Sequence, residues 1–254
     1  GENEEYQVKD YFRVKQTNIR MYLLDYARTA ERIFYSDNPV FTETSLNLGI
    51  QWNEIPYMSN EEGSVVNFVV SNELWSYDVA QNKLSKVFSF KNGNDKRGLH
   101  DEFEIQLVNM EDSGSMDFVV KGYMNRGRHE GETGIAVMRY DSLTNTTEEL
   151  LFIESNECSD VLAQTVGELI YISYDDKMYV SLSGDIYAID LNIKSVETLT
   201  EDLKSGDYLI SRAGDMIAWQ HGADRFSSSQ ITTMDMKTGV RHTYDAKSGE
   251  YLRA

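Results

Sequence analysis

Cysteine and proline are scarce in this chain of 254 residues, which contains one cysteine and two prolines. The lone Cys158 excludes an internal disulfide and any zinc site of the CxxC or Cys/His type. No apolar run approaches the roughly 18 residues that a membrane-spanning helix needs. The scarcity of proline and the lack of low-complexity tracts exclude collagen-like and linker classes. What remains is a globular chain whose 41% hydrophobic residues are enough to build a core.

Basic residues are also in short supply. The sequence has 24 Lys and Arg against 42 Asp and Glu, which gives a formal net charge of −18. This balance repels phosphate backbones and anionic membrane surfaces, so we expect no nucleic-acid partner. A chain of this length fits one large all-β domain or two small domains.

The N-terminus carries neither an initiator Met nor a signal peptide, because the chain begins Gly1-Glu2-Asn3. An N-terminal Gly of this kind resembles the scar of a cleaved tag. We therefore expect a piece of a longer protein, whose parent could be membrane-anchored although this segment has no membrane span.

A repeat runs through the whole chain. A short strand that ends in Asp, followed by a turn and a second strand, occurs five times. The shared aspartates are Asp25, Asp78, Asp141, Asp190 and Asp235. Their spacings of 53, 63, 49 and 45 residues are typical of a four-stranded propeller blade, and an inserted loop at 124–132 accounts for the longest one. The short acidic side chain suits a tight hairpin, where it can accept a hydrogen bond from a backbone N–H two residues further on.

Two further strand candidates precede most of these hairpins, which completes the strand order of a blade. The best helical candidate is 18–32, but it aligns with the other Asp hairpins, so we interpret it as strand. Asn145 and Gly239 lie at turn positions that favour a residue tolerant of positive φ. We predict a single domain, 1–254, with repeat units at roughly 4–37, 44–90, 102–155, 160–200 and 206–254.

The repeated pattern, Ile/Leu-x-x-Tyr/Met/Ile-Asp-x-x-Thr/Asn, preceded by Asp/Glu-x-Ile/Val-x-Tyr/Trp, resembles the TolB-type β-propeller repeat. WD dipeptides, paired kelch glycines and sialidase boxes are missing from the sequence. The resemblance implies an all-β fold, a β-propeller of four-stranded blades with about five blade repeats. TolB-like propellers serve as protein-binding platforms, as envelope sensors and as gating domains of prolyl oligopeptidases.

Whether the ring closes stays open at this point. The first unit supplies only one strand, VKDYFRVKQ, before its Asp hairpin, and the chain ends with the extra segment GEYLRA. This last segment can pair with the first unit and close a five-bladed ring, or it can begin another blade of a larger, partial ring.

Motifs for catalysis are missing from the sequence: it has no GxSxG elbow, Walker A loop, GxGxxG, HExxH or EF-hand loop. We therefore expect no catalytic residues, no cofactor and no enzymatic activity. A hydrolase on this chain would need a site assembled from distant loops.

Basic and histidine side chains collect in loops that a propeller places on one rim, namely those joining second to third strands and those joining one blade to the next. The ligand-binding candidates are Arg97, His100, Arg126, Arg128, His129, His221 and Arg225. Arginines there could hold a carboxylate or phosphate bidentately. The alternative is that these are solvated loops whose charges pair with one another at little net gain. A metal site from His100, Asp101, His129 and Glu130 lacks any recognisable ligand spacing, so we predict no metal.

The leading hypothesis is a monomeric, non-enzymatic, extracytoplasmic propeller of the bacterial envelope that binds a protein or a small anionic ligand on its rim. The alternative is a propeller accessory domain of a prolyl-oligopeptidase-like hydrolase whose catalytic domain lies outside this chain. A structural repeat domain without a ligand is the third possibility. A hydrolase domain or a membrane segment in the parent chain would distinguish the first two.

Overall fold

The computed structural model describes residues 5–34, 45–48, 55–92, 95–100, 102–203, 207–221 and 230–245. These residues form four four-stranded antiparallel sheets and one two-stranded sheet, which confirms the all-β prediction. Helix within them is limited to a 3-10 turn, η1 (Lys96–Leu99), and the short α1 (Ser159–Thr165). Neither of these two helices has the length and apolar character to cross a bilayer.

Each four-stranded sheet is a meander of consecutive strands, as in a propeller blade. The first sheet holds β3 (Tyr57–Ser59), β4 (Val65–Val70), β5 (Glu73–Asp78) and β6 (Lys83–Phe88). The second holds β7 (Phe103–Met110), β8 (Met116–Tyr123), β9 (Thr133–Asp141) and β10 (Thr146–Ser155). The third holds β11 (Val166–Ile172), β12 (Lys177–Leu182), β13 (Asp185–Asp190) and β14 (Ser195–Thr200). The fourth holds β15 (Tyr208–Ile210), β16 (Met216–His221), β17 (Gln230–Asp235) and β18 (Arg241–Asp245).

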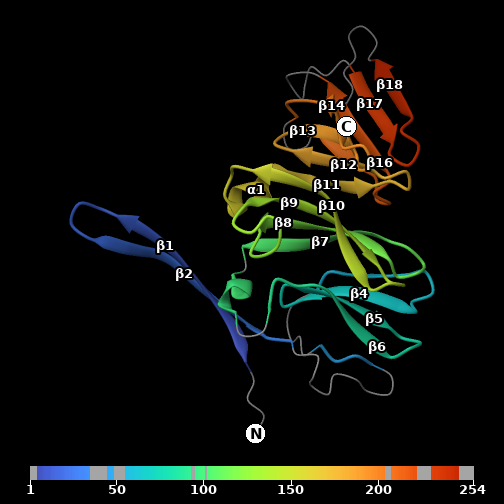
Figure 1. Ribbon diagram of the computed structural model, residues 1–254. Coiled ribbons are helices and arrows are strands. Elements are labelled where there is room, and N and C mark those ends of the chain that lie inside the picture. Colours follow the sequence, from blue (N-terminus) through green and yellow to red (C-terminus); the bar gives the residue numbers. More distant parts are fainter. Residues whose placement is uncertain are drawn as a thin grey trace.

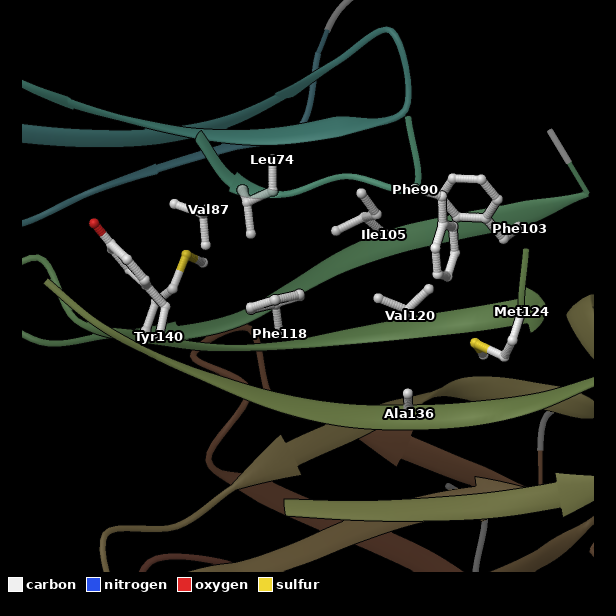
Figure 2. Close-up of a cluster of buried hydrophobic side chains, with 11 residues drawn as sticks. Leu74, Val87, Phe90, Phe103, Ile105, Phe118, Val120, Met124, Ala136 and Tyr140 are labelled. Atoms are coloured by element: carbon white, nitrogen blue, oxygen red, sulfur yellow. The ribbon is translucent and has the colours of Figure 1, made fainter. Parts of the chain in front are cut away.

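The four sheets stack face to face along an arc, in chain order (Figure 1). Their first strands lie on the inner side, where β7 contacts both β3 and β11. Strand alternation sends one set of side chains to each neighbouring sheet. Between the first and second sheets, for example, Leu74 meets Ile105 and Phe118 in a continuous apolar layer (Figure 2). Leu74 and Phe118 are fully buried, and each such side chain contributes about 2 kcal/mol to folding.

The repeated aspartates close the third strand of every four-stranded sheet, as predicted. Asp141 Oδ1 accepts a hydrogen bond from the backbone N–H of Leu143 at 2.8 Å, and Asp235 Oδ1 accepts one from Lys237 at 2.9 Å. Asn145 has φ 53° and Gly239 has φ 70°, which confirms the two turn positions. The local rule that a short acidic side chain begins a hairpin therefore holds four times in this chain.

The first predicted repeat unit is not a blade, and this part of the prediction was wrong. Strands β1 (Tyr6–Gln16) and β2 (Met21–Arg32) pair with each other as a long two-stranded hairpin that projects from the arc (Figure 1). Within this unit, the strand prediction for 18–32 is confirmed for Met21–Arg32, whereas residues 18–20 belong to the turn. The turn forms at Thr17, whose backbone N–H donates to Arg20 at 3.0 Å. Asp25, which resembled the other hairpin aspartates, lies inside β2 opposite Arg13.

Three described side chains from the region after this hairpin pack on the outer face of the first sheet. Phe34 is buried and meets the ring of Trp75 edge-on, with 5.3 Å between centroids. Leu46 and Leu48 pack against the same cluster. The fourth sheet lies at the opposite end of the arc, so the described residues form an open arc of blades (Figure 1). The proposed closing segment 249–254 lies outside the described residues.

Candidate functional site

Two loops meet on the rim of the second sheet, and we call residues 95–100 and 124–132 together the rim site. The first loop links β6 to β7 and the second links β8 to β9. Asn125 is buried and its side-chain amide donates to the carbonyl oxygen of His100 at 2.6 Å, which ties the loops together. Propeller topology predicts that these two loops share one face, and the Asn125–His100 hydrogen bond joins them directly.

A glycine at the end of β8 allows this close approach. Gly122 has φ 126°, and a Cβ there would lie 2.4 Å from the carbonyl oxygen of Glu102. The backbone N–H of the next residue, Tyr123, donates to that same oxygen at 2.8 Å. A side chain at position 122 would push the two loops apart.

Asp95 organises the arginines of the rim site. It caps η1 by accepting from the backbone N–H of Arg97 at 2.9 Å, and its Oδ2 accepts from Arg97 Nε and Nη2 at 3.0 and 2.8 Å. Arg126 forms an ion pair with the same carboxylate. Hydrogen bonds from the side chain and the backbone N–H of Arg97 hold the pKa of Asp95 well below its usual range. One ionised carboxylate thus positions two guanidinium groups.

The remaining cations of the rim site differ in how they are paired. Arg97 Nη1 also lies 2.5 Å from Glu130 Oε1, with both side chains well exposed. Lys96 and Arg128 are exposed, and no ion pair joins either of them to another described residue. The rim site therefore combines two arginines fixed by Asp95 with two exposed cations that form no ion pair within the described part of the chain.

His129 is enclosed by acidic and aromatic neighbours. Its Nδ1 lies 2.8 Å from Glu132 Oε2 and its Nε2 lies 3.0 Å from Glu149 Oε1. The imidazole stacks on Phe152 with 3.7 Å between ring centroids. Burial opposes its charge, but the hydrogen bonds to Glu149 and Glu132 prevail and raise the pKa of His129. His129 therefore anchors the 124–132 loop to β10.

The other predicted residues are less involved. The ring of His100 meets Tyr123 edge-on at 5.0 Å, and its Nε2 lies 3.6 Å from Glu102. His221 ends β16 on the same rim of the fourth sheet, and its side chain, like Arg225 and Asp101, lies outside the described part of the structure. Among the described residues, His, Cys, Asp and Glu form no group of three that could hold a metal ion.

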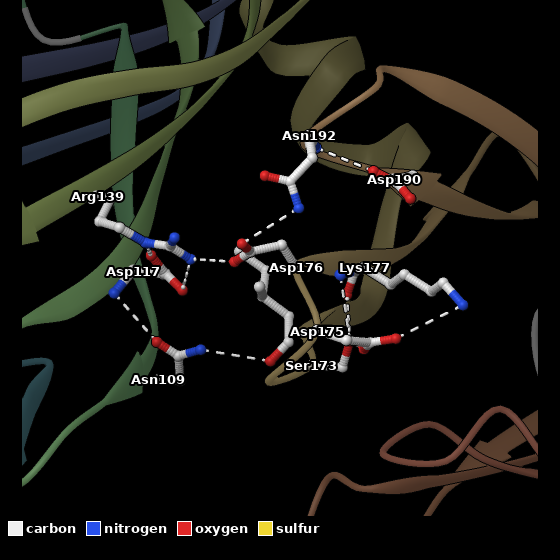
Figure 3. Close-up of polar contacts among 10 residues, drawn as sticks. Asn109, Asp117, Arg139, Ser173, Asp175, Asp176, Lys177, Asp190 and Asn192 are labelled. Carbon is white, nitrogen blue, oxygen red and sulfur yellow. Dashed lines mark hydrogen bonds and ion pairs between the residues drawn. The ribbon is translucent and has the colours of Figure 1, made fainter.

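Sequence reasoning missed a polar cluster on the opposite rim, where the second and third sheets meet (Figure 3). Arg139 donates from Nε to Asp117 Oδ1 at 2.7 Å and from Nη2 to Asp176 Oδ1 at 2.7 Å. Asn109 bridges the same two sheets by donating to the carbonyl oxygen of Ile172 at 3.3 Å. A cavity of about 330 Å³ opens beside Arg139 and Asp117. The one available signal was Asp117, an acid inside the apolar run of β8.

Comparison with known proteins gives no family assignment. No family model matches the chain, and no curated protein matches it. Among solved structures it is similar to TolB from Acinetobacter baumannii, with 14% identity and a TM-score of 0.40 over 87% of this chain and 49% of TolB. It is also similar to tricorn protease, with 16% identity and a TM-score of 0.43 over 85% of this chain and 19% of the protease. An oligogalacturonate lyase in complex with manganese shares 13% identity and a TM-score of 0.31 over 73% of this chain and 63% of the lyase.

The chain thus spans about half of TolB and about a fifth of tricorn protease. Structural similarities at this level support no conclusion about the activity, substrate or partner of this chain. The propeller architecture follows from the strand order and the sheet packing given above.

Proposed function

We propose that this chain is a non-enzymatic, extracytoplasmic β-propeller domain that binds an acidic segment of a partner protein at the rim site. The observation that carries the proposal is the gathering of Lys96, Arg97, Arg126 and Arg128 on two joined loops of a chain whose net charge is −18. The extracytoplasmic setting is supported by the resemblance of the repeated sequence pattern to TolB-type propellers and by the presence of a single cysteine.

The binding step that we propose is an exchange of ion pairs. The Arg97–Glu130 pair is exposed, and such pairs contribute only about 0–1 kcal/mol, so an incoming carboxylate can replace Glu130 at low cost. Asp95 keeps Arg97 and Arg126 oriented during the exchange. A guanidinium held in this way loses little rotamer freedom when it forms a second pair. Arg128 and Lys96 supply further attraction for a segment with several carboxylates.

The test uses a fluorescein-labelled oligoglutamate peptide as the acidic probe, with fluorescence anisotropy as the readout. Replacing Arg97 and Arg128 together by Gln should raise the Kd about tenfold or more, since charge-assisted contacts of roughly 1.5 kcal/mol or more are lost. Both side chains are exposed, so folding should be retained. Glu130→Gln should lower the Kd several-fold because it frees Arg97.

The matched control removes two positive charges from the opposite rim, with Lys194 and Lys237 changed to Gln. Both lie in turns after third strands. Because each double variant loses two positive charges, the control has the same net charge as the rim variant. An equal loss of affinity in the two variants would show that the peptide senses only net charge and would overturn the rim assignment. Binding of inorganic phosphate or citrate in place of the peptide would assign a small anion to the site instead.

A further inference from the structure

Three large apolar side chains are exposed on the rim opposite the rim site. Leu143 is 87% and Ile193 is 74% exposed, and Tyr174 is fully exposed. Leu143 and Ile193 lie in the turns after β9 and β13, and Tyr174 lies in the turn between β11 and β12. Turns after the first and third strands of an antiparallel meander lie at the same end of the sheet. The three side chains therefore share one rim.

A cavity and two hydrogen bonds bring these turns together. Leu143 lines the cavity of about 330 Å³ together with Arg139. Arg139 donates to Asp176 in the β11–β12 turn, and Asp176 Oδ2 accepts from Asn192 Nδ2 at 3.3 Å (Figure 3). Asn192 directly precedes Ile193. The apolar side chains are thus grouped around the cavity rather than scattered singly over the surface.

The hairpin turns do not require these apolar residues. Counted from the aspartate that ends each third strand, Leu143 corresponds to Ala80 in the first sheet and to Lys237 in the fourth. The backbone N–H of Lys237 donates to Asp235 just as that of Leu143 donates to Asp141. The same turn therefore forms with a charged residue at this position, and turn formation does not account for the exposed leucine.

The turns around the cavity are acidic. We call four of them together the turn surface, which comprises residues 111–117, 139–144, 173–177 and 190–195. They contain seven Asp and Glu against three Lys and Arg. Two of these three cations are already paired within the turn surface. Arg139 is held by Asp117 and Asp176, and Lys177 Nζ lies 3.6 Å from Asp175.

Two carboxylates that line the cavity are not paired. Glu111 and Asp141 form no ion pair with another described residue. Hydrogen bonds from the backbone N–H groups of Thr144 and Leu143 hold the pKa of Asp141 below its ordinary value. Met116 and Leu143 add apolar wall to the same cavity. Its volume is near the lower end of the range of about 300–1,000 Å³ for ligand pockets, so it suits one long side chain with an apolar stem and a cationic end.

We propose that the turn surface binds a basic segment of a partner protein, whose Lys or Arg side chain enters the cavity while its apolar neighbours cover Leu143, Tyr174 and Ile193. Charge complementarity selects this occupant, because seven acids against three cations attract a basic segment and repel nucleic acids and anionic lipid surfaces. The exposed apolar side chains supply contact area beside the charged centre. This inference is independent of the rim site, which lies on the opposite rim and attracts the opposite charge.

The first experiment selects binders from a library of random peptides displayed on phage, with the native chain immobilised. Each round begins with a counter-selection on the variant in which Leu143 and Ile193 are both changed to Ser. Both side chains are exposed, so the variant should fold and keep the rim site, and peptides that bind there are removed. Enrichment of peptides that place Lys or Arg beside Leu, Ile or an aromatic residue is expected. No enrichment, or enrichment of acidic or purely apolar peptides, would overturn the proposal whether or not the rim site binds its own partner.

The second experiment measures the affinity of a fluorescein-labelled copy of the most enriched peptide by fluorescence anisotropy. Changing Glu111 to Gln and Asp112 to Asn should raise the Kd about tenfold or more, because charge-assisted contacts are lost. The matched control changes Glu61 and Glu62 to Gln, an exposed acidic pair in the equivalent turn of the first sheet, and should leave the Kd unchanged. If the two variants weaken binding equally, net charge rather than the cavity governs it and the proposal fails. Displacement of the peptide by n-butylamine at an equal concentration would assign the cavity to a small amine and would also overturn the proposal.

Discussion

Arg139 and Asp176 join the second and third sheets through a hydrogen bond of 2.7 Å from Nη2 to Oδ1. The same guanidinium holds Asp117, whose side chain is only 6% exposed, through contacts of 2.7 and 3.1 Å. Asp117 thus carries a nearly buried charge whose counterion comes from the next strand and is held in place by the next sheet. Hydrogen bonding to Asp117, and then to Asp176, raises the pKa of Arg139, so this cation is retained at any ordinary pH.

The first prediction concerns the contacts of Arg139 with Asp117 and Asp176. Arg139→Ala should lower the free energy of unfolding by about 3–5 kcal/mol, because it leaves the carboxylate of Asp117 buried without a counterion. Urea denaturation followed by tryptophan fluorescence measures the change. Asp176→Asn removes only the more exposed partner and should cost about 1 kcal/mol or less. The exposed Arg128→Ala is the surface control, with an expected change within about 0.5 kcal/mol. Similar losses in all three variants would contradict the special role of Asp117.

The hairpin turns of this fold could be predicted from short sequence patterns. The arrangement of the first two strands could not, because it depends on pairing between distant parts of the chain. The aspartates at 141 and 235 form the expected hairpin contacts because a turn depends on a few consecutive residues. Asp25 matches the same local pattern, yet it lies within a strand because the turn formed earlier, at Thr17. Whether two strands join a blade or project as an arm depends on contacts with residues far along the chain.

At the rim site, too, the position of the loops could be predicted but the pairing of their side chains could not. Propeller topology was sufficient to predict that Arg97 and Arg126 lie close together, since each belongs to a loop class that shares one face. Their partners across the two loops could not be predicted, because the Arg126–Asp95 and Arg97–Glu130 pairs each join residues from different loops, and no local pattern indicates them. The Arg139–Asp176 contact joins residues 37 positions apart in different sheets, and no local pattern indicates it.

The second prediction concerns Glu73, which is buried beneath the rim of the first sheet with 3% exposure. Its Oε1 accepts from Ser89 Oγ at 2.6 Å and lies 3.1 Å from Lys86 Nζ, while Oε2 lies 3.8 Å from Lys91 Nζ. Burial lowers the pKa of Lys91, so this lysine depends on the carboxylate for its charge. Glu73→Ala should therefore destabilise the fold by about 3 kcal/mol or more.

Lys86→Ala is the matched change for the same carboxylate. Lys86 is 46% exposed, and loss of such a partner costs about 0–1 kcal/mol. Thermal and urea unfolding of the two variants measure the difference. Equal losses would mean that Glu73 acts through its exposed partner rather than through the buried network with Ser89 and Lys91.

The third prediction is a pH dependence at His129. The hydrogen bonds to Glu149 and Glu132 outweigh the effect of burial and raise the pKa of His129 above the ordinary histidine value of about 6.5. A group whose pKa is raised in the folded state contributes stability that is complete below its unfolded pKa and is lost as the pH rises through the folded pKa. The difference in unfolding free energy between the native chain and His129→Gln should therefore be largest near about pH 6 and shrink toward about pH 9. Urea denaturation across this range measures the difference, and an NMR titration of the imidazole gives the folded pKa directly.

In a variant with Glu132 and Glu149 both changed to Gln, the same His129→Gln difference should no longer fall as the pH rises, because the carboxylates that favour the imidazolium are gone. A difference that stays constant with pH in the native background would show that stacking on Phe152, rather than charge, anchors this loop.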